Sequence, residues 1–241
     1  DRYFFEANLG YNGSENFSPE KRFGFFPAFG LGWAISNEAW WESLQETVSY
    51  FKVRYTDGLV GTDAVTGRRF MYLDQMASVD GYRFGDQNNG VGGWGFSKYG
   101  ANVGWSTSRK QDLGVDLKFF KDNLSLTLDI FKEHRKDILL SDGTAPSVLG
   151  FTLPPANLGI VDSWGWEVSL KWNDNIGKDF RYYLGLNLSY NQNEIVEQKE
   201  APLNNAYQYA KGHRIGARSL YKFFEYYNEN TPQRYKEVFG Q

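Results

Sequence analysis

An all-β fold, a segment of an antiparallel transmembrane β-barrel, is predicted from three features of the sequence. Apolar and polar residues alternate with a period of two over several long stretches, which places them on opposite faces of a strand. The longer stretches, such as residues 160–172, exceed the about 5 to 6 residues that are typical of strands in soluble sheets. Short and long connections alternate between them, as in outer-membrane barrels with short periplasmic turns and long extracellular loops. The chain has room for about eight such strands.

Composition narrows the class of protein further. The 241 residues carry 26 Lys and Arg against 29 Asp and Glu, a net charge of −3, which argues against the basic surface of a nucleic-acid-binding protein. Aromatic residues make up 18% of the chain although its mean hydropathy is −0.55, and no apolar run reaches the about 18 residues of a membrane helix. Cysteine is absent, which excludes a disulfide scaffold, a thiolate zinc site and a cysteine nucleophile.

The first expected strands each have one apolar face. Alternate positions from Tyr3 to Tyr11 are apolar, and they lie opposite Glu6, Asn8, Gly10 and Asn12. Residues 23–35 continue the pattern with mainly aromatic side chains. Pro27 lies on their apolar face and is expected to mark a bulge or a bend, because proline donates no backbone hydrogen bond. Residues 49–55 place two basic side chains opposite the aromatic and aliphatic ones.

Four further strands are expected over residues 113–119, 124–130, 160–172 and 180–190. In the last of these, the apolar face has aromatic rings at both ends and leucine in the middle. That order is typical of a transmembrane β-strand, whose rings lie at the two membrane interfaces. The tryptophans expected to act as interface anchors are Trp33, Trp164, Trp166 and Trp172.

The connections divide into two groups by length. Residues 121–123 and 173–179 are short turns, and residues 37–46 are expected to form a third periplasmic connection. The opposite, extracellular end is expected to carry long loops rich in Gly, Ser, Asn and Pro. These loops cover residues 12–21, 58–102, 141–157 and the chain from 195 onward.

Five ordered blocks carry a family resemblance. They are YFFEANLGYNGSENF (3–17), RFGFFPAFGLGW (22–33), DLGVDLKFFKDNLSLTLDIFKEHRKDIL (112–139), LPPANLGIVDSWGWEVSLKW (153–172) and GHRIG (212–216). They resemble the barrel of SusC/RagA-like TonB-dependent transporters of the Bacteroidota outer membrane, over roughly residues 2–220.

The resemblance implies a 22-stranded barrel with an N-terminal plug, and a Ton box through which the TonB complex supplies energy. It also implies a SusD-like surface lipoprotein acting as a lid, and uptake of oligosaccharides or peptides without chemistry on them. On this basis residues 1–241 are expected to be a partial barrel domain, embedded in outer-membrane lipid, that contains neither plug nor Ton box. No cofactor, metal or nucleic-acid partner is expected.

Charges of both signs lie on the second face of the expected strands. We expect them to face the barrel lumen, where water solvates them and neighbouring strands or a plug pair with them. A soluble β-sandwich, the alternative fold, would have to bury them at high cost. The charges assigned to the lumen are Glu6, Lys52, Arg54, Asp112, Asp116, Lys118, Asp129, Glu133, Glu167, Lys171 and Arg181.

Aromatic residues of the loop at 58–102 are the candidate binding residues. Sugars stack on such rings, and nearby Asn, Asp and Gln side chains can bind their hydroxyls. Three roles stay open for these rings: ligand binding, contact with the lid protein, and packing within the loop. The rings are Tyr82, Phe84, Trp94, Phe96 and Tyr99.

Catalysis finds little support in the sequence. His134 and His213 each stand alone, which favours solvated side chains over a general base or a metal ligand. GVGGWG (90–95) lacks the Lys-Ser/Thr of a phosphate-binding loop, and DGLVGTD (57–63) lacks the ligand spacing of an EF-hand. Two other functions stay open: a secreted carbohydrate-binding β module, and a small self-contained outer-membrane barrel or adhesin.

Overall fold

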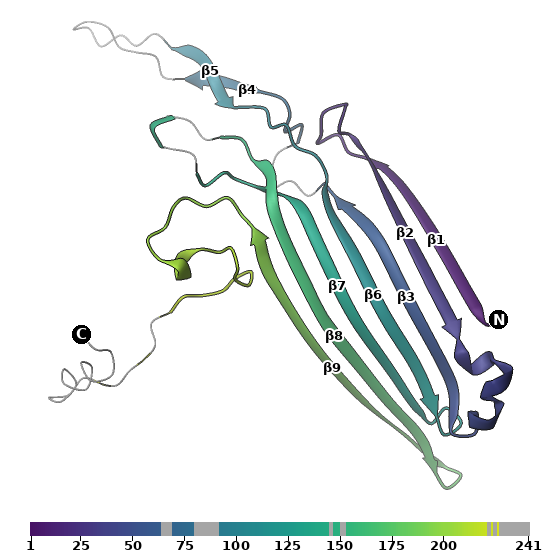
Figure 1. The fold of residues 1–241 in the computed structure, drawn as a ribbon. Helices are drawn as coiled ribbons and strands as arrows, with labels where there is room; N and C mark the ends of the chain where they lie inside the picture. The colour runs from purple at the N-terminus through teal and green to yellow at the C-terminus, as the bar shows by residue number, and fades with distance from the viewer. Residues whose placement is uncertain are drawn as a thin grey trace, which may run out of the picture.

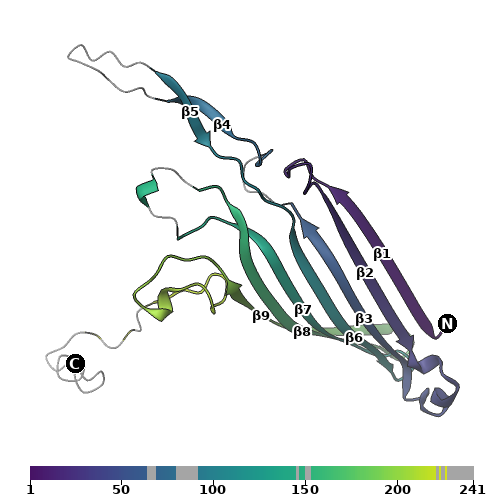
Figure 2. The same ribbon diagram turned by 45° about the horizontal axis from the view of Figure 1, so that its top comes forward.

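A computed structural model describes residues 1–63, 69–79, 92–144, 147–149 and 153–220, together with residues 223 and 226. Its main feature is a seven-stranded antiparallel sheet in the order β1-β2-β3-β6-β7-β8-β9, and a separate two-stranded hairpin pairs β4 with β5 (Figure 1). The sheet is bowed, and the hairpin projects beyond one of its ends (Figure 2).

The strands of the sheet match the stretches expected from the sequence. They are β1 (Tyr3–Gly13), β2 (Phe23–Ala34), β3 (Val48–Thr62), β6 (Ser106–Phe119), β7 (Leu124–Leu140), β8 (Ala156–Ile176) and β9 (Phe180–Glu197). Most run further toward the long loops than the apolar pattern alone indicates, because polar residues beyond the apolar stretch continue the backbone pairing. The hairpin strands are β4 (Gln75–Val79) and β5 (Gly93–Lys98).

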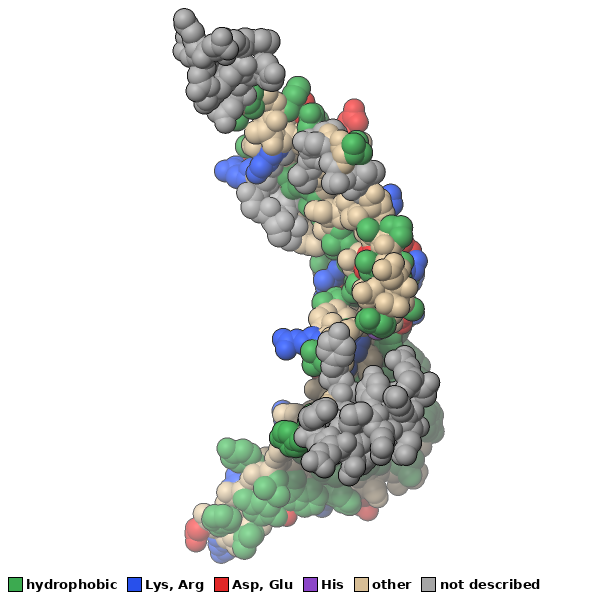
Figure 3. Space-filling model, turned by 90° about the vertical axis from the view of Figure 1, so that its left-hand side faces the viewer, with side chains coloured by type: hydrophobic (Ala, Val, Ile, Leu, Met, Phe, Trp, Pro, Cys, Tyr) green, Lys and Arg blue, Asp and Glu red, His purple; other side chains and the backbone are tan. Residues whose placement is uncertain are grey.

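One face of the sheet is apolar from strand to strand. The register places the following residues opposite one another in a single row: Phe5, Leu31, Tyr55, Leu113, Ile130, Trp166 and Tyr190. Among the described residues no second layer covers this face, since Phe5 is 71% and Ile130 62% exposed. Hydrophobic side chains gather toward the end of the molecule that carries the short turns (Figure 3). A face this apolar and this exposed fits lipid, as the β-barrel interpretation requires.

The sheet is open among the described residues. β1 and β9 form its two edges and do not pair with each other. The described residues form seven strands in the sheet and two in the hairpin, close to the expected number of about eight.

Pro27 does not mark a bulge, and that part of the expectation is wrong. The register between β1 and β2 runs unbroken through the pair Leu9–Pro27. The ladder between β2 and β3 instead ends at the pair Ala28–Gly58, next to the proline. Pro27 therefore occupies a position where one side of the strand is already unpaired, so its missing N–H costs no ladder hydrogen bond.

The short connections lie at one end of the sheet, as expected. The turn between β6 and β7 has left-handed backbone at Phe120, Lys121 and Asp122, with φ of 54°, 56° and 73°. Between β2 and β3 the chain forms two 3-10 helices, η1 (Ile35–Asn37) and η2 (Ala39–Leu44). No helix among the described residues is both long and apolar enough to cross a membrane.

Glu38 ties these helices to the sheet. Its carboxylate accepts hydrogen bonds from the Tyr3 hydroxyl at 3.0 Å and the Trp33 indole at 3.1 Å, and Arg2 lies 3.3 Å away. The bond from Trp33, and then the bond from Tyr3, hold the pKa of the Glu38 carboxyl below its ordinary value. Trp33 thus has a polar contact at the short-turn end, as an interface anchor needs.

A small hydrophobic core lies at the opposite end, under the long loops. It consists of Phe17, Met71, Ala101 and Val103, with Trp105 packed against it. The described part of the loop expected at 58–102 is therefore more regular than its sequence indicates. β3 continues to Thr62, and the β4–β5 hairpin rises from the packed base.

Candidate functional site

On the polar face of the sheet, Arg54 contacts the carboxylates of three aspartates. The Arg54 guanidinium lies 3.3 Å from a carboxylate oxygen of Asp112 and 3.3 Å from one of Asp116, and it also binds Asp129. Each of these four side chains is less than a third exposed. One cation thus links three carboxylates on two other strands, and the cluster keeps an excess of negative charge.

Gly114 makes this cluster possible. It lies opposite Arg54 on one side and opposite Asp129 on the other, so Arg54 reaches β7 across a position of β6 that has no side chain. A Cβ atom at Gly114 would overlap the Arg54 guanidinium. This role of Gly114 is not among the sequence predictions, although a glycine at a lumen position between charged neighbours is a signal of close approach.

Replacing Gly114 should therefore disrupt the cluster. We expect Gly114→Ala in the full-length protein to lower the free energy of unfolding by about 1–3 kcal/mol, because the new methyl group displaces Arg54 from Asp129. Gly30→Ala is the matched control on the same face, since its Cβ would meet Glu6 and Thr56 at 3.6 and 3.7 Å, which is ordinary contact. Denaturant unfolding in lipid vesicles measures both, and equal costs would contradict the role of Gly114.

The other charges assigned to the lumen are spread over the same face. Lys52 lies opposite Asp116, and its ammonium group is 4.5 Å from the centre of the Phe4 ring. Lys118 lies 3.6 Å from Asp122 in the short turn. Glu167 lies directly opposite Asp129, Lys171 opposite Ser125, and Arg181 opposite Asn175. The structure thus gathers Asp112, Asp116 and Asp129 around Arg54. Lys118, Lys171 and Arg181 lie nearer the short-turn end.

A shallow hollow adjoins the acidic side of the cluster. It has a volume of about 260 Å³, and its polar lining includes Asp129, Glu167, Ser169, Asn187 and Ser189. Among the residues that the structure describes, no group of three or more His, Cys, Asp or Glu side chains is arranged to hold a metal ion. The hollow is a place where hydrogen-bonding and cationic groups could contact the wall.

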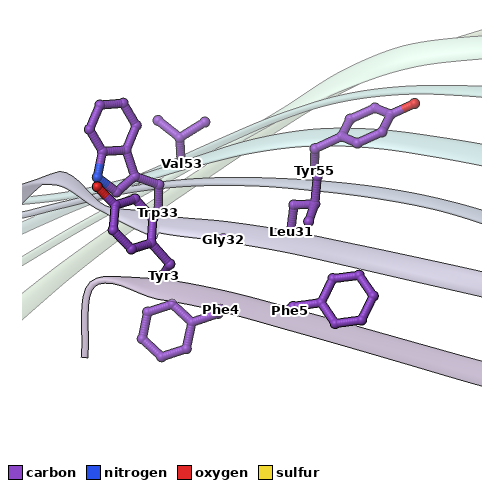
Figure 4. A pocket seen from close by; sticks show the side chains of 8 residues that line it. All are labelled: Tyr3, Phe4, Phe5, Leu31, Gly32, Trp33, Val53 and Tyr55. Carbon is purple, nitrogen blue, oxygen red and sulfur yellow. The ribbon is translucent and has the colours of Figure 1, made fainter.

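A larger concavity belongs to the other face. It measures about 490 Å³ and is lined by Tyr3, Phe4, Phe5, Leu31, Gly32, Trp33, Val53 and Tyr55 (Figure 4). The Tyr3 and Trp33 rings stack there at a centroid distance of 6.2 Å. Most of this lining belongs to the apolar, lipid-facing surface at the edge strand, so we assign the concavity to lipid contact and not to a cargo site.

The β4–β5 hairpin carries the candidate binding rings that the structure describes. Trp94 and Phe96 lie opposite Ser78 and Met76 on one face of the hairpin, and they are 75% and 53% exposed. Phe96 stacks on Tyr99 with ring centroids 5.2 Å apart. Tyr82 and Phe84 lie outside the described residues. The structure thus brings Phe96 and Tyr99 together and leaves the Trp94 ring largely exposed.

A match to a known protein family decides the family of this chain. A family model described as "TonB dependent receptor-like, beta-barrel" matches residues 1–238. The chain belongs to the TonB-dependent receptor family. The resemblance seen in the sequence blocks is thereby confirmed, and the apolar face of this receptor's sheet lies in an outer membrane.

Relatives of this TonB-dependent receptor are much longer. TonB-dependent receptor P39 of Formosa agariphila is 29% identical over 236 residues, which cover 95% of this chain and 22% of P39. TonB-dependent receptor SusC of Bacteroides thetaiotaomicron is 26% identical over 248 residues, covering 95% of this chain and 24% of SusC. The chain therefore spans less than a quarter of the length of either relative.

Solved structures show the same fold. The RagAB peptide importer in its closed-closed state matches 84% of this chain with a TM-score of 0.69 and 21% sequence identity, over 21% of the matched chain. The open-open state of the same importer matches 82% of this chain with a TM-score of 0.70. The open sheet of this receptor segment is thus part of the wall of a barrel.

Proposed function

We propose that the protein imports oligosaccharides or peptides across the outer membrane, as a TonB-dependent transporter that works with a SusD-like surface lipoprotein. The observation that carries the proposal is the two-faced sheet, apolar outward and polar inward, in a chain that belongs to the TonB-dependent receptors. In this proposal residues 1–241 form part of the barrel wall, and the plug and the Ton box belong to other parts of the protein.

The lumen face supports transport of cargo without strong net charge. The cations Arg54 and Lys118 already contact carboxylates of the wall, so they are not free to select an anionic cargo. The excess negative charge at Asp129 and Glu167 is a suitable partner for basic side chains of a plug. In this mechanism the wall contacts the plug and lines the passage for the cargo. No residue of the wall performs chemistry on the substrate.

The projecting hairpin supports a role in capture. Trp94 exposes a flat ring at the extracellular end, where a lipoprotein lid or the incoming cargo would meet the barrel. Packing within the loop covers only part of Phe96, which stacks on Tyr99 and stays 53% exposed, and it does not account for Trp94. We therefore assign the exposed face of the hairpin, Trp94 with Phe96, to contact with lid or cargo.

The two other functions fit less well. A secreted carbohydrate-binding module would expose the apolar row of the sheet to water over all seven strands. A small self-contained barrel would need β1 and β9 to pair, and they form opposite edges.

Uptake in cells tests the proposal. Cells that lack the full-length protein should fail to take up labelled oligosaccharides or peptides, and cells that lack TonB should show the same defect. Trp94→Ala with Phe96→Ala should reduce uptake about tenfold or more, because alanine removes the stacking surface. Val79→Ala is the matched control, since Val79 lies on the other face of the hairpin and is also exposed.

The readout separates the two roles of the hairpin. Loss of lipoprotein co-purification in the Trp94/Phe96 variant assigns the face to the lid, and retained co-purification with weaker cargo binding assigns it to cargo. TonB-independent uptake would contradict the proposed function. Equal uptake by this variant and Val79→Ala would contradict only the role of the hairpin.

A further inference from the structure

The lipid-facing side of β7 changes character at one position. Toward the short turns its outward residues are aliphatic, and toward the loops they are basic. From one end to the other they are Leu124, Leu126, Leu128, Ile130, Lys132, His134 and Lys136. The change coincides with the interface anchors, because Trp166 lies opposite Ile130 and Trp164 opposite Lys132. The basic residues therefore begin where the hydrocarbon layer meets the outer polar layer.

Two of the basic side chains in this region already have carboxylate partners. The Arg109 guanidinium donates to both carboxylate oxygens of Asp57, at 3.0 and 2.6 Å. Nδ1 of His134 lies 2.5 Å from a carboxylate oxygen of Asp162. With a carboxylate beside each of them, Arg109 and His134 offer little free positive charge to an outside ligand.

Lys132 and Lys136 are different. Both side chains are exposed, and within the described part of the chain neither ammonium group has a hydrogen-bond or ion-pair partner. Their register neighbours on β6 are uncharged, Gln111 for Lys132 and Thr107 for Lys136. On β8, Lys132 faces Trp164, and the nearest acid of that strand, Asp162, is held by His134. The two lysines thus present unneutralised positive charge on the outside of the barrel.

We propose that Lys132 and Lys136 bind the phosphate groups of an anionic lipid of the outer leaflet. An ammonium group is a strong partner for phosphate, and its attraction grows at the edge of a low-dielectric layer. Ile130 and Trp164 lie directly below and beside Lys132 and offer apolar surface to the acyl chains. A lipid can cover this apolar surface with its acyl chains, whereas a free phosphate ion cannot. The surface therefore favours a lipid as the ligand.

The spacing of the lysines favours a headgroup with two anionic groups. Four residues of strand separate their backbones by about 13 Å. One small anion can contact one ammonium group or the other, whereas a wide headgroup with two phosphates can occupy both. The site lies on the outer surface, so it is separate from the cargo path and rests only on the membrane topology.

Native mass spectrometry of the full-length, detergent-solubilised protein tests the site, with diphosphorylated lipid A as the probe. Lys132→Gln with Lys136→Gln should weaken lipid A binding about tenfold or more, since each basic residue near the membrane surface contributes to attraction. Lys110→Gln with Lys178→Gln is the matched control. It removes the same charge from the lumen side of β6 and from the short turn before β9. Heat-modifiable migration on gels confirms that each variant is folded.

Three results would overturn the proposal. The first is unchanged lipid A binding by the folded Lys132/Lys136 variant. The second is an equal loss of binding toward dephosphorylated lipid A, because the lysines would then act through packing. The third is displacement of lipid A by millimolar inorganic phosphate, which would identify an anion site without lipid selectivity. Failure of cargo uptake in cells has no bearing on these outcomes.

Discussion

Arginine at position 186 should destabilise the barrel by about 2–4 kcal/mol, because it places a charge on the lipid-facing side near the middle of the membrane. Leu186 lies in β9 opposite Leu170, on the apolar face, and it is 51% exposed with no protein layer over it among the described residues. The free energy of unfolding of the full-length Leu186→Arg protein in phospholipid vesicles measures the cost.

Asn187→Arg is the matched control for this prediction. Asn187 is the next residue of the same strand, and it lies opposite Ser169 on the polar face and lines the hollow beside Asp129 and Glu167. Its arginine would meet water and carboxylates, so we expect a change within about 0.5 kcal/mol. Equal costs at the two positions would mean that the assignment of faces is wrong.

Removing Arg54 should produce the second large effect. Arg54→Met leaves Asp112, Asp116 and Asp129 facing one another without their shared cation. The side chains are partly exposed, so water screens part of the repulsion, and we expect a loss of about 1–3 kcal/mol of unfolding free energy. Denaturant unfolding of the full-length protein in vesicles at neutral pH measures the loss.

A double-mutant cycle makes this prediction specific. Asp129→Asn added to Arg54→Met should recover part of the loss, with a coupling energy of about 1 kcal/mol or more, because it removes one of the unpaired carboxylates. Lys171→Met is the control on the same face, where the residue opposite is the uncharged Ser125, and we expect it to cost little. Purely additive effects of Arg54→Met and Asp129→Asn would rule out the cluster as a cooperative unit.

The strands and their two faces were predictable from local pattern. β9 begins at Phe180, where the alternation begins, and the turn at 121–123 joins β6 to β7 as expected. The ends of the strands were not predictable where the alternation of apolar and polar residues stops. The strand continuations beyond Thr56 in β3 and beyond Phe131 in β7 contain polar residues on both faces, and only pairing with a neighbouring strand holds them extended.

The hairpin and the role of Pro27 could not be predicted in this way. Gly and Asn residues around β4 and β5 favour a turn-rich loop, and the packing of Met71 and Ala101 on Phe17 supplies an ordered base that the local sequence does not indicate. Pro27 has the same sequence context whether it bulges or not. The outcome depends on where the ladder to β3 stops, which is a property of two strands together.

In the candidate site, too, one part follows from the sequence and another part from the tertiary structure. Side chains alternate across any extended strand, so the chain alone assigns Lys52, Arg54, Asp112, Asp116, Glu167 and Lys171 to one face, and places apolar residues on the other, whatever the neighbours are. Which charges meet depends on the register between strands, and no local pattern specifies it. Arg54 binds Asp129, 75 positions away, because the folded register places Gly114 between them, and the guanidinium occupies the space that a side chain there would fill.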